Sequence, residues 1–154
     1  IFHKETTELL EITTFFNKDN FYIGKNFETK EECINFLADE AIKKGLMNNN
    51  AKMSIFEREE MSSTSIGDLV AIPHPIYNEC GTSFISILIL NKPIIWDDLF
   101  VQVVFLLNVE KGKMNLWEPM FLKLYNYIKL KNGVNSILKN KSYEVFINEF
   151  EKMF

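Results

Sequence analysis

The pattern of apolar residues along the chain indicates a sheet enclosed between helices. Two runs, Phe84 to Leu90 and Val101 to Leu107, are almost continuously apolar and are rich in residues that fit a pleated surface. Strands without a polar face are typical of sheets that are covered by helices on both sides. The pattern therefore predicts an α/β fold with a buried central sheet.

Shorter segments extend this sheet. Phe21 to Ile23 is a candidate for a brief strand, and Pro93 to Trp96 is a candidate for another between the two long runs. Leu69 to Ile72 is short, apolar and ended by Pro73, which suits a strand that delivers His74 to an edge.

Helical spacing of apolar residues predicts two helices between the short strands at Phe21 to Ile23 and Leu69 to Ile72. Thr29 and Glu32 fit a capping box, in which each side chain satisfies a free backbone N–H of the first turn, and Gly45 has the position of a left-handed C-terminal residue. A second helix is expected from Ala51 to about Glu60, capped by one of the preceding Asn residues. The residues expected to face inward from it are Met53 and Phe56, with Ile55 as a further candidate.

Further helices are predicted in the last third of the chain. The first runs from about Asn115 to Lys131, with Pro119 tolerated because it lies in the first turn. A short helix follows Gly133, and Ser142 caps a final one. Residues 1–20 have mixed spacing and predict a short helix or an irregular segment. The inward residues of the first and last of these helices are Trp117, Phe121, Leu124 and Ile128, and Phe146, Phe150 and Met153.

Length and composition fit one globular domain over residues 1–154. The chain is 47% hydrophobic and 25% charged, and it has no internal repeat and no Pro- or Gly-rich linker. It begins at Ile1 rather than Met, from which we expect either a processed tag or a segment excised from a longer protein.

Charge, cysteines and hydropathy argue against several classes of protein. The net charge of -4 argues against direct binding of nucleic acid, which needs clustered Lys and Arg. Cys33 and Cys80 lie far apart and form no Cys-x-x-Cys motif, which favours a reduced, cytoplasmic compartment. No run approaches the roughly 18 apolar residues that a membrane span needs, so no membrane insertion is expected.

The stretch from Ile55 to Pro75 carries the candidate chemistry. His74 stands between two prolines that fix two φ angles, so the backbone around the imidazole is stiff. A phosphoryl acceptor needs such placement, because in-line transfer depends on alignment. Taken alone, a histidine beside an apolar strand is more often a structural residue, and both interpretations stay open at this point.

Arg58 and a cluster of hydroxyl side chains precede this histidine. The guanidinium of Arg58 is a planar, permanently charged fork that matches phosphate oxygens; a surface ion pair with a neighbouring glutamate is the alternative. Ser62 to Gly67 is predicted to be a turn, since Ser and Thr are poor residues for a helix interior. Its hydroxyl and N–H groups can bind an anion, or the turn can merely end the helix.

The whole string is more specific than its parts. Arg-Glu-x-x-Ser-Ser-Thr-x-x-Gly from Arg58 to Gly67, followed by Ala-Ile-Pro-His from Ala71 to His74, closely resembles the signature of the mannitol/fructose class of enzyme IIA domains. These domains belong to the bacterial sugar phosphotransferase system (PTS). The capped helix before the string and the two long strands after it are also similar to this family, so the resemblance covers most of the chain.

The resemblance implies a mixed sheet of about five strands flanked by helices on both faces. It also implies that Nε2 of His74 accepts a phosphoryl group from the phosphohistidine of the carrier protein HPr, which transport members pass on to a cysteine of a IIB domain. Arg58 would neutralise charge on the phosphoryl group, with Ser63 or Thr64 assisting it. No metal and no organic cofactor are implied.

One departure from the family pattern concerns a second histidine. Transport members usually carry one after the strand that matches Val101 to Leu107, near the start of the next helix. Here the nearest positions hold Asn108 and Asn115, and the other histidine of the chain, His3, is expected to be a solvated terminal residue. Fast onward transfer to a sugar permease is therefore not expected.

A second departure is Pro75, where many transport members have Gly. Ile-Pro-His-Pro, together with Lys-Pro-Ile-x-Trp from Lys92 to Trp96, is more similar to the enzyme IIA-like domain that ends multidomain regulators and antiterminators of the BglG type. Those proteins carry nucleic-acid-binding domains and PTS regulation domains upstream. Phosphorylation of their modules switches gene expression.

The sequence favours a phosphoryl-accepting module of a PTS-controlled transcriptional regulator, modified on His74 by phospho-HPr or a IIB component. Its expected partners are HPr, IIB proteins and the PTS regulation domains of the same chain. The alternative is an enzyme IIA phosphotransferase of a fructose- or mannitol-type transport system, so whether the domain is an enzyme or purely regulatory stays open. A binding platform without phosphotransfer is disfavoured because Arg58 and His74 are both present.

Overall fold

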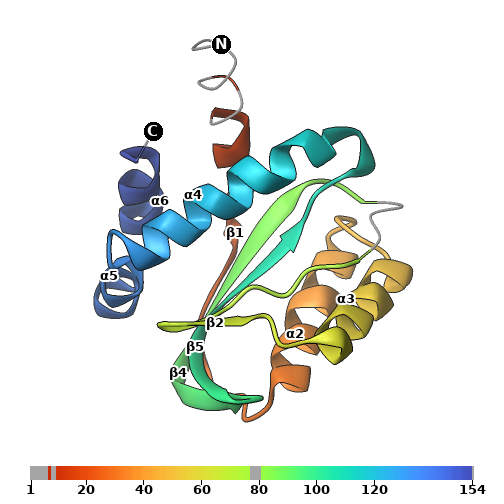
Figure 1. Cartoon of the computed structure of the whole chain (residues 1–154), viewed down its shortest axis with the longest axis horizontal. Coiled ribbons are helices and arrows are strands. Elements are labelled where there is room, and N and C mark those ends of the chain that lie inside the picture. The colour runs from red at the N-terminus through yellow and green to blue at the C-terminus, as the bar shows by residue number, and fades with distance from the viewer. Residues whose placement is uncertain (1–6, 8–9, 77–80, 154) are drawn as a thin grey trace.

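A five-stranded mixed sheet forms the centre of the molecule (Figure 1). The computed structural model describes residues 7, 10–76 and 81–153; His3 and Cys80, named above, lie outside the described residues. β1 is parallel to β4 and β3 is parallel to β5, whereas the β4–β5 and β2–β3 pairs are antiparallel. In their order across the sheet, the strands are β1 (Phe16–Lys25), β4 (Phe84–Trp96), β5 (Leu99–Asn108), β3 (Leu69–Ala71) and β2 (Ser65–Gly67).

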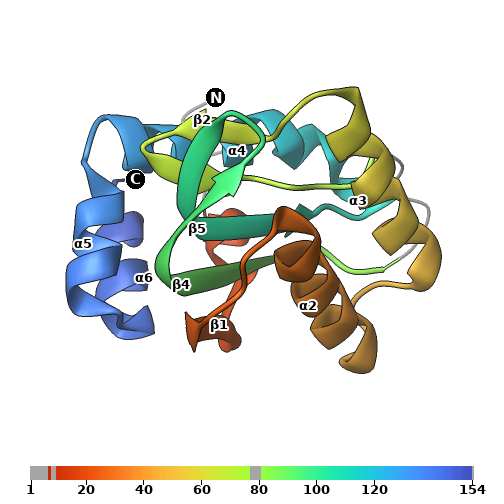
Figure 2. The same cartoon turned by 90° about the horizontal axis from the view of Figure 1, so that it is seen from below.

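Helices cover both faces of this sheet. Figures 1 and 2 show α2 and α3 on one side of the strands and α4, α5 and α6 on the other. The helices are α2 (Lys30–Lys43), α3 (Asn49–Met61), α4 (Trp117–Lys129), α5 (Gly133–Asn140) and α6 (Tyr143–Glu151), and the 3-10 helix η1 (Lys111–Leu116) leads directly into α4.

The two layers of helices create two separate hydrophobic cores. Ile85, Ile87 and Ile89 of β4 point into the core beneath α4 and α6, whereas Leu88 and Leu90 point into the core beneath α2 and α3. All five side chains are at most 1% exposed. The almost continuous apolar run of β4 thus serves two cores in alternation, as the sequence predicted.

Most of the predicted helix ends are confirmed. The side chains of Thr29, Asn48 and Ser142 each accept a hydrogen bond from a backbone N–H in the first turn of the helix that follows. Gly45 has a φ of 74°, the left-handed conformation expected of a residue that ends a helix. The mixed sheet with helices on both faces is likewise confirmed.

Three predictions about the strands are corrected. β1 begins at Phe16, well before the predicted Phe21, and the segment predicted at Pro93 to Trp96 is the end of β4 rather than a strand of its own. The predicted turn from Ser62 to Gly67 contains β2, which pairs along the outer side of β3. β3 is therefore not an edge strand, and His74 lies beyond its carboxyl end.

The inward face of α3 also differs from the prediction. Met53 is 56% exposed, whereas Ile55 is fully buried and Ala51 and Glu59 are each 5% exposed. These three buried residues recur every four positions and form one stripe along the helix. A glutamate on this stripe hides the pattern from a search for apolar residues alone.

Gly133 at the start of α5 offers a test of the packing between α4 and α5. A Cβ atom there would lie 2.2 Å from Cε2 of the Tyr127 ring, which is buried and cannot move aside freely. We expect Gly133→Ala to lower the free energy of unfolding by about 1–3 kcal/mol, measured by urea denaturation. Gly112→Ala is the matched control, because its Cβ would have no atom within 4 Å. Equal stabilities of the two variants would contradict this account.

Candidate functional site

The segment that carries His74 is held by hydrogen bonds to two different layers of the fold. The N–H of Leu107 in β5 donates to the carbonyl of Pro73 (3.1 Å), and the N–H of Ile76 donates to Oγ of Ser54 in α3 (2.8 Å). One residue before Pro73, the N–H of Ile72 donates to the carbonyl of Thr64 (3.0 Å). These bonds add to the stiffness of the two prolines, so the backbone position of His74 is fixed.

The imidazole of His74 is oriented by its own backbone. Nδ1 lies 2.9 Å from the carbonyl oxygen of Ile72. A carbonyl oxygen can only accept, so Nδ1 carries the proton, and in the neutral ring Nε2 keeps a free lone pair. The hydrogen bond thus leaves Nε2 as the ring nitrogen with an available lone pair.

The surroundings of His74 favour the neutral ring. Burial lowers the pKa of His74 below its ordinary value of 6.5, and the positive charge of Arg58 lowers it further. The hydrogen bond to Ile72 and the negative charge of Glu59 act in the opposite direction without reversing the shift. The indole of Trp117 contributes to the burial, since its ring centroid lies 4.8 Å from that of the imidazole.

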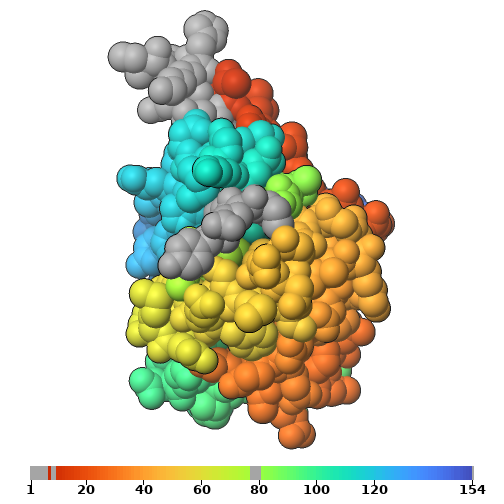
Figure 3. Space-filling model, turned by 90° about the vertical axis from the view of Figure 1, so that its right-hand side faces the viewer, coloured from red at the N-terminus to blue at the C-terminus, as the bar shows by residue number. Residues whose placement is uncertain are grey.

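A surface pocket brings His74 and Arg58 together. Its volume is about 330 Å³, and its walls come from three parts of the chain that are distant in sequence. Figure 3 shows the face on which they meet, with α3 in yellow below η1 and the start of α4 in cyan. The lining residues are Arg58 and Met61 of α3, His74, Pro75 and Ile76 after β3, and Met114 and Trp117 of η1 and α4.

Arg58 is placed at the pocket by the end of α3. Its Nη1 donates to the carbonyl of Ser62 (2.8 Å) and to Oγ of Ser62 (3.2 Å). A cation in the last turn satisfies a carbonyl at the helix end and interacts favourably with the helix dipole. No ion pair between Arg58 and a carboxylate occurs within the described part of the chain, so the alternative of a surface ion pair with Glu57, Glu59 or Glu60 is not what the structure shows.

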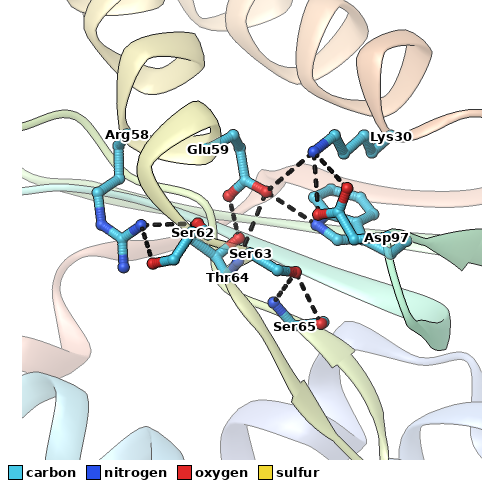
Figure 4. Close-up of polar contacts among 9 residues, drawn as sticks. Lys30, Arg58, Glu59, Ser62, Ser63, Thr64, Ser65 and Asp97 are labelled. Carbon is cyan, nitrogen blue, oxygen red and sulfur yellow. Dashed lines mark hydrogen bonds and ion pairs between the residues drawn. The ribbon is translucent and has the colours of Figure 1, made fainter.

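Ser63 and Thr64 do not line the pocket, and their hydroxyls have other partners (Figure 4). The hydroxyl and the N–H of Thr64 both donate to the carboxylate of Glu59. Oγ of Ser63 accepts from the N–H of Ser65 (3.1 Å) and shares a hydrogen bond with Oγ of Ser65 (2.8 Å). Binding of a phosphoryl group by these residues stays a prediction, and it would require each hydroxyl to change its partner.

Sequence reasoning missed Glu59, which has the most polar contacts of any buried residue in this region. Its side chain is 3% exposed and accepts a hydrogen bond from Nε1 of Trp96 (2.9 Å) in addition to those from Thr64. Trp96 itself is completely buried. The signal that could have found Glu59 is its place four residues after Ile55, on the buried stripe of α3.

The positions that replace a second histidine have different environments. Asn108 is 1% exposed and its Nδ2 donates to the carbonyl of Thr82 (2.8 Å), while its Oδ1 has no partner among the described residues. Asn115 is exposed in η1. The side chain that contacts His74 from this part of the chain is instead Trp117.

Comparison with known proteins identifies a family that covers most of the chain. Residues 14–153 match the family model described as "Phosphoenolpyruvate-dependent sugar phosphotransferase system, EIIA 2". In the part of the chain that the structure describes, no helix is both long and apolar enough to span a bilayer.

Two relatives from Bacillus subtilis are regulators by name. The "Probable licABCH operon regulator" is 34% identical over 138 residues, which are 90% of this chain and 22% of the relative. "Transcriptional regulator ManR" is 26% identical over 148 residues, which are 96% of this chain and again 22% of the relative. The chain therefore spans about a fifth of the length of these regulators.

A transport component is also similar. The mannitol-specific phosphotransferase enzyme IIA component of Halalkalibacterium halodurans is 30% identical over 94 residues, which are 59% of this chain and 65% of that protein.

Solved structures share the fold. The nitrogen regulatory protein IIA-Ntr of Neisseria meningitidis superposes with a TM-score of 0.82 at 17% identity, over 91% of this chain and 99% of that one. Enzyme IIA-Mtl of Escherichia coli, solved in complex with phosphorylated enzyme IIB-Mtl, gives a TM-score of 0.74 at 16% identity, over 90% and 99% of the two chains. From the family match over residues 14–153, the chain belongs to the EIIA 2 family of the phosphoenolpyruvate-dependent sugar phosphotransferase system.

Proposed function

We propose that this domain accepts a phosphoryl group on Nε2 of His74 and serves as the enzyme IIA-like module of a sugar-responsive transcriptional regulator. One observation carries the chemical part of the proposal. The hydrogen bond from Nδ1 to Ile72 leaves the lone pair of Nε2 available on a ring that lines the same pocket as Arg58. The positive charge of Arg58 opposes protonation of the ring. It therefore helps to keep the Nε2 lone pair available, which a phosphoryl acceptor needs and a purely structural histidine does not.

The reaction is an exchange between two nitrogens. Nε2 of His74 attacks the phosphorus of a phosphohistidine on the donor, which we take to be HPr; the donor's P–N bond breaks and its electron pair returns to the donor ring. As the new bond forms, the ring of His74 acquires positive charge, which the carbonyl of Ile72 stabilises through Nδ1–H. Arg58 offsets the negative charge of the phosphoryl oxygens.

Arg58 has donors to spare for this role. A guanidinium carries five N–H groups, and the contacts of Arg58 with Ser62 use Nη1 alone. The remaining donors can form a fork with two phosphoryl oxygens. The chemistry needs alignment and charge compensation, which the residues of the pocket supply, and we assign no metal or organic cofactor to it.

The regulatory part of the proposal rests on the relatives. Two proteins that match nearly the full length of this chain are named as regulators, and this chain corresponds to about a fifth of each. We infer that the domain acts in the cytoplasm as one module of such a protein. Adding about two negative charges at His74 would alter its docking to neighbouring PTS regulation domains.

A IIB component is the second partner that we assign. The structure of the Escherichia coli mannitol enzyme IIA, which shares this fold, was solved with phosphorylated IIB. Exposed apolar side chains surround the pocket of His74, with Met61 70%, Met114 45% and Ile76 37% exposed. Such a rim can pack against a partner and exclude water from the phosphoryl group.

The second candidate function is that of an enzyme IIA in mannitol or fructose transport. It is favoured by the similarity to the Halalkalibacterium halodurans mannitol component. Asn at positions 108 and 115 argues against it, because the resemblance places a second active-site histidine near there in transport members.

Phosphorylation of His74 is the first prediction. Incubation with phosphorylated HPr should add one phosphoryl group to the domain, detected by intact mass spectrometry without acid, since the P–N bond is acid-labile. His74→Ala should abolish this gain. His3→Ala removes the other histidine of the chain and should leave it unchanged. An unmodified wild-type domain, or a phosphorylated His74→Ala variant, would refute the proposal.

The pKa of His74 provides a second prediction. A pH titration followed by NMR should give an imidazole pKa below 6.5 for His74. The folded state then binds the proton more weakly than the unfolded state, so stability should fall as the pH drops from 6.5 through the folded pKa. Trp117→Ala exposes the ring and should move the pKa back towards its ordinary value. A pKa above 6.5 in the wild-type domain would be inconsistent with this environment.

Onward transfer separates the regulator from the transport enzyme. If the domain belongs to a regulator, its phosphoryl group should pass to a mannitol-type IIB cysteine much more slowly than that of a transport enzyme IIA under the same conditions. The measurement is the rate of loss of phosphohistidine after IIB is added, with the mannitol enzyme IIA as the reference. Transfer as fast as the reference would favour the transport function.

A further inference from the structure

We propose that Glu59 is a positioning residue for phosphoryl transfer, which fixes the last turn of α3 so that Arg58 faces the pocket of His74. This inference rests on the proposed function, because it assigns a role to Glu59 within the same site. Glu59 itself does not line the pocket, so it acts through its neighbour and not by contact with the phosphoryl group.

The carboxylate of Glu59 joins four segments of the chain (Figure 4). It extends from the last turn of α3, and its oxygens accept from the indole N–H of Trp96 at the end of β4 and from Thr64 just before β2. The ammonium of Lys30, the first residue of α2, lies 4.0 Å away. Only a carboxylate, which is purely an acceptor, can serve an indole, a hydroxyl and an ammonium at once.

The carboxylate of Glu59 is stabilised mainly by hydrogen bonds. Burying a carboxylate is costly unless it is paired and hydrogen-bonded. Lys30 lies 4.0 Å away, but its ammonium bonds to both oxygens of Asp97 (2.8 and 2.9 Å), so Glu59 relies chiefly on the donors of Trp96 and Thr64. The arrangement is therefore specific in geometry, since any rotation of the helix end would separate Glu59 from three donors.

Arg58 lacks comparable restraints of its own. Its hydrogen bonds go to Ser62 in the same turn, so they fix the guanidinium relative to α3 but not relative to His74. Figure 4 shows the guanidinium of Arg58 beside Ser62, whereas the carboxylate of Glu59 lies between Thr64 and Lys30. The rotation of α3 that places Glu59 among its donors therefore also places Arg58 at the pocket.

A purely structural role for Glu59 would predict only a loss of stability. A positioning role predicts in addition that the effect on transfer depends on Arg58. The two can be separated with Glu59→Gln, Arg58→Lys and the double variant, by measuring the initial rate of phosphorylation by phospho-HPr at a temperature where all are folded.

We expect Glu59→Gln to slow phosphorylation by on the order of tenfold to a hundredfold, because the amide offers one acceptor oxygen and a misplaced Arg58 aligns the phosphoryl group poorly. Arg58→Lys should also slow it. The double variant should be no slower than Arg58→Lys alone, since the guanidinium that Glu59 positions is already gone. Independent, multiplicative effects would overturn the proposal, as would a wild-type rate in Glu59→Gln.

Glu149→Gln is the matched control. Glu149 also accepts from an aromatic residue, the hydroxyl of Tyr127 (3.2 Å), and from a side-chain hydroxyl, that of Ser136 (2.9 Å). These contacts lie between α4, α5 and α6, and none of the three residues lines the pocket of His74. Its rate of phosphorylation should equal that of the wild-type domain even where its stability is reduced.

A second variant covers the case in which Glu59→Gln does not fold. Trp96→Phe removes one donor to Glu59 and lies in the core, away from the pocket, so it cannot touch the phosphoryl group. Trp96→Phe should slow transfer less than Glu59→Gln does. Combining it with Arg58→Lys should give a rate no lower than that of Arg58→Lys alone. A wild-type rate of phosphorylation in a folded Trp96→Phe variant would contradict the positioning role of Glu59. Multiplicative effects of Trp96→Phe and Arg58→Lys in the double variant would also contradict it.

The orientation of Arg58 can be followed without any transfer. The side-chain Nε–H signal of Arg58 in NMR spectra should shift in Glu59→Gln and stay in place in Glu149→Gln. An unchanged signal in Glu59→Gln would refute the positioning role. If this signal moves as expected but the wild-type domain accepts no phosphoryl group, then the proposed function fails while the structural coupling of Glu59 to Arg58 holds.

Discussion

The site depends on the hydrogen bonds that hold the segment after β3 between the sheet and α3. The carbonyl of Pro73 accepts from β5, and the N–H of Ile76 donates to Ser54 of α3. Between these two anchors, His74 turns its Nδ1 to the carbonyl of Ile72. Under the proposed function, this preorganisation favours transfer, because a ring that must align with a phosphorus atom on another protein loses less freedom when the partner arrives.

The end of α3 supplies the other half of the site. Its two adjacent charged residues, Arg58 and Glu59, lie in different environments. Arg58 stays at the surface, where a phosphoryl group can approach it, whereas Glu59 enters the interior and bonds with Trp96 and Thr64. A buried carboxylate with one partner removed would leave unpaired polar groups, which cost about 1–3 kcal/mol each. We therefore expect loss of one of these interior contacts to disturb the end of α3, from which Arg58 also extends.

Sequence patterns predicted the architecture and the two central side chains, but not the contacts that arrange them. The alternating cores of β4 and the caps at Thr29, Asn48 and Ser142 follow from local rules, and these were confirmed. β2 was missed because it forms through tertiary contacts: it pairs with β3, and Lys129 of α4 donates to the carbonyl of Ile66 (2.6 Å) and pairs with Asp68 (2.6 Å). Ser62 to Gly67 has turn character by itself, and only its last three residues form β2 by pairing with β3.

The same limit applies to the candidate site. His74 and Arg58 could be named from the sequence alone. Phosphoryl transfer needs a nucleophilic group and a charged group, and the motif has these two residues at a fixed spacing. The contacts of Glu59 and Trp117 could not be predicted: the place of Glu59 four residues after Ile55 signals its burial, but neither residue carries a sign of which side chain it will contact. Their roles arise from where the chain brings α3, β4 and α4 together.

Asn108 occupies one of the positions near which transport members of the family are expected to carry a second histidine. Its side chain is buried and its amide holds Thr82, in the segment that returns to β4, so it is committed to the fold and is not available to a phosphoryl group. Among the described residues that line the pocket of His74, the permanent cation is Arg58, whose charge does not depend on pH and which has no nucleophilic lone pair. Under the proposed function, such a residue would stabilise the phosphorylated ring, and the group would leave only by attack from a nucleophile of a partner protein. Under the proposed function, that chemistry suits a domain that holds its phosphoryl group as a signal.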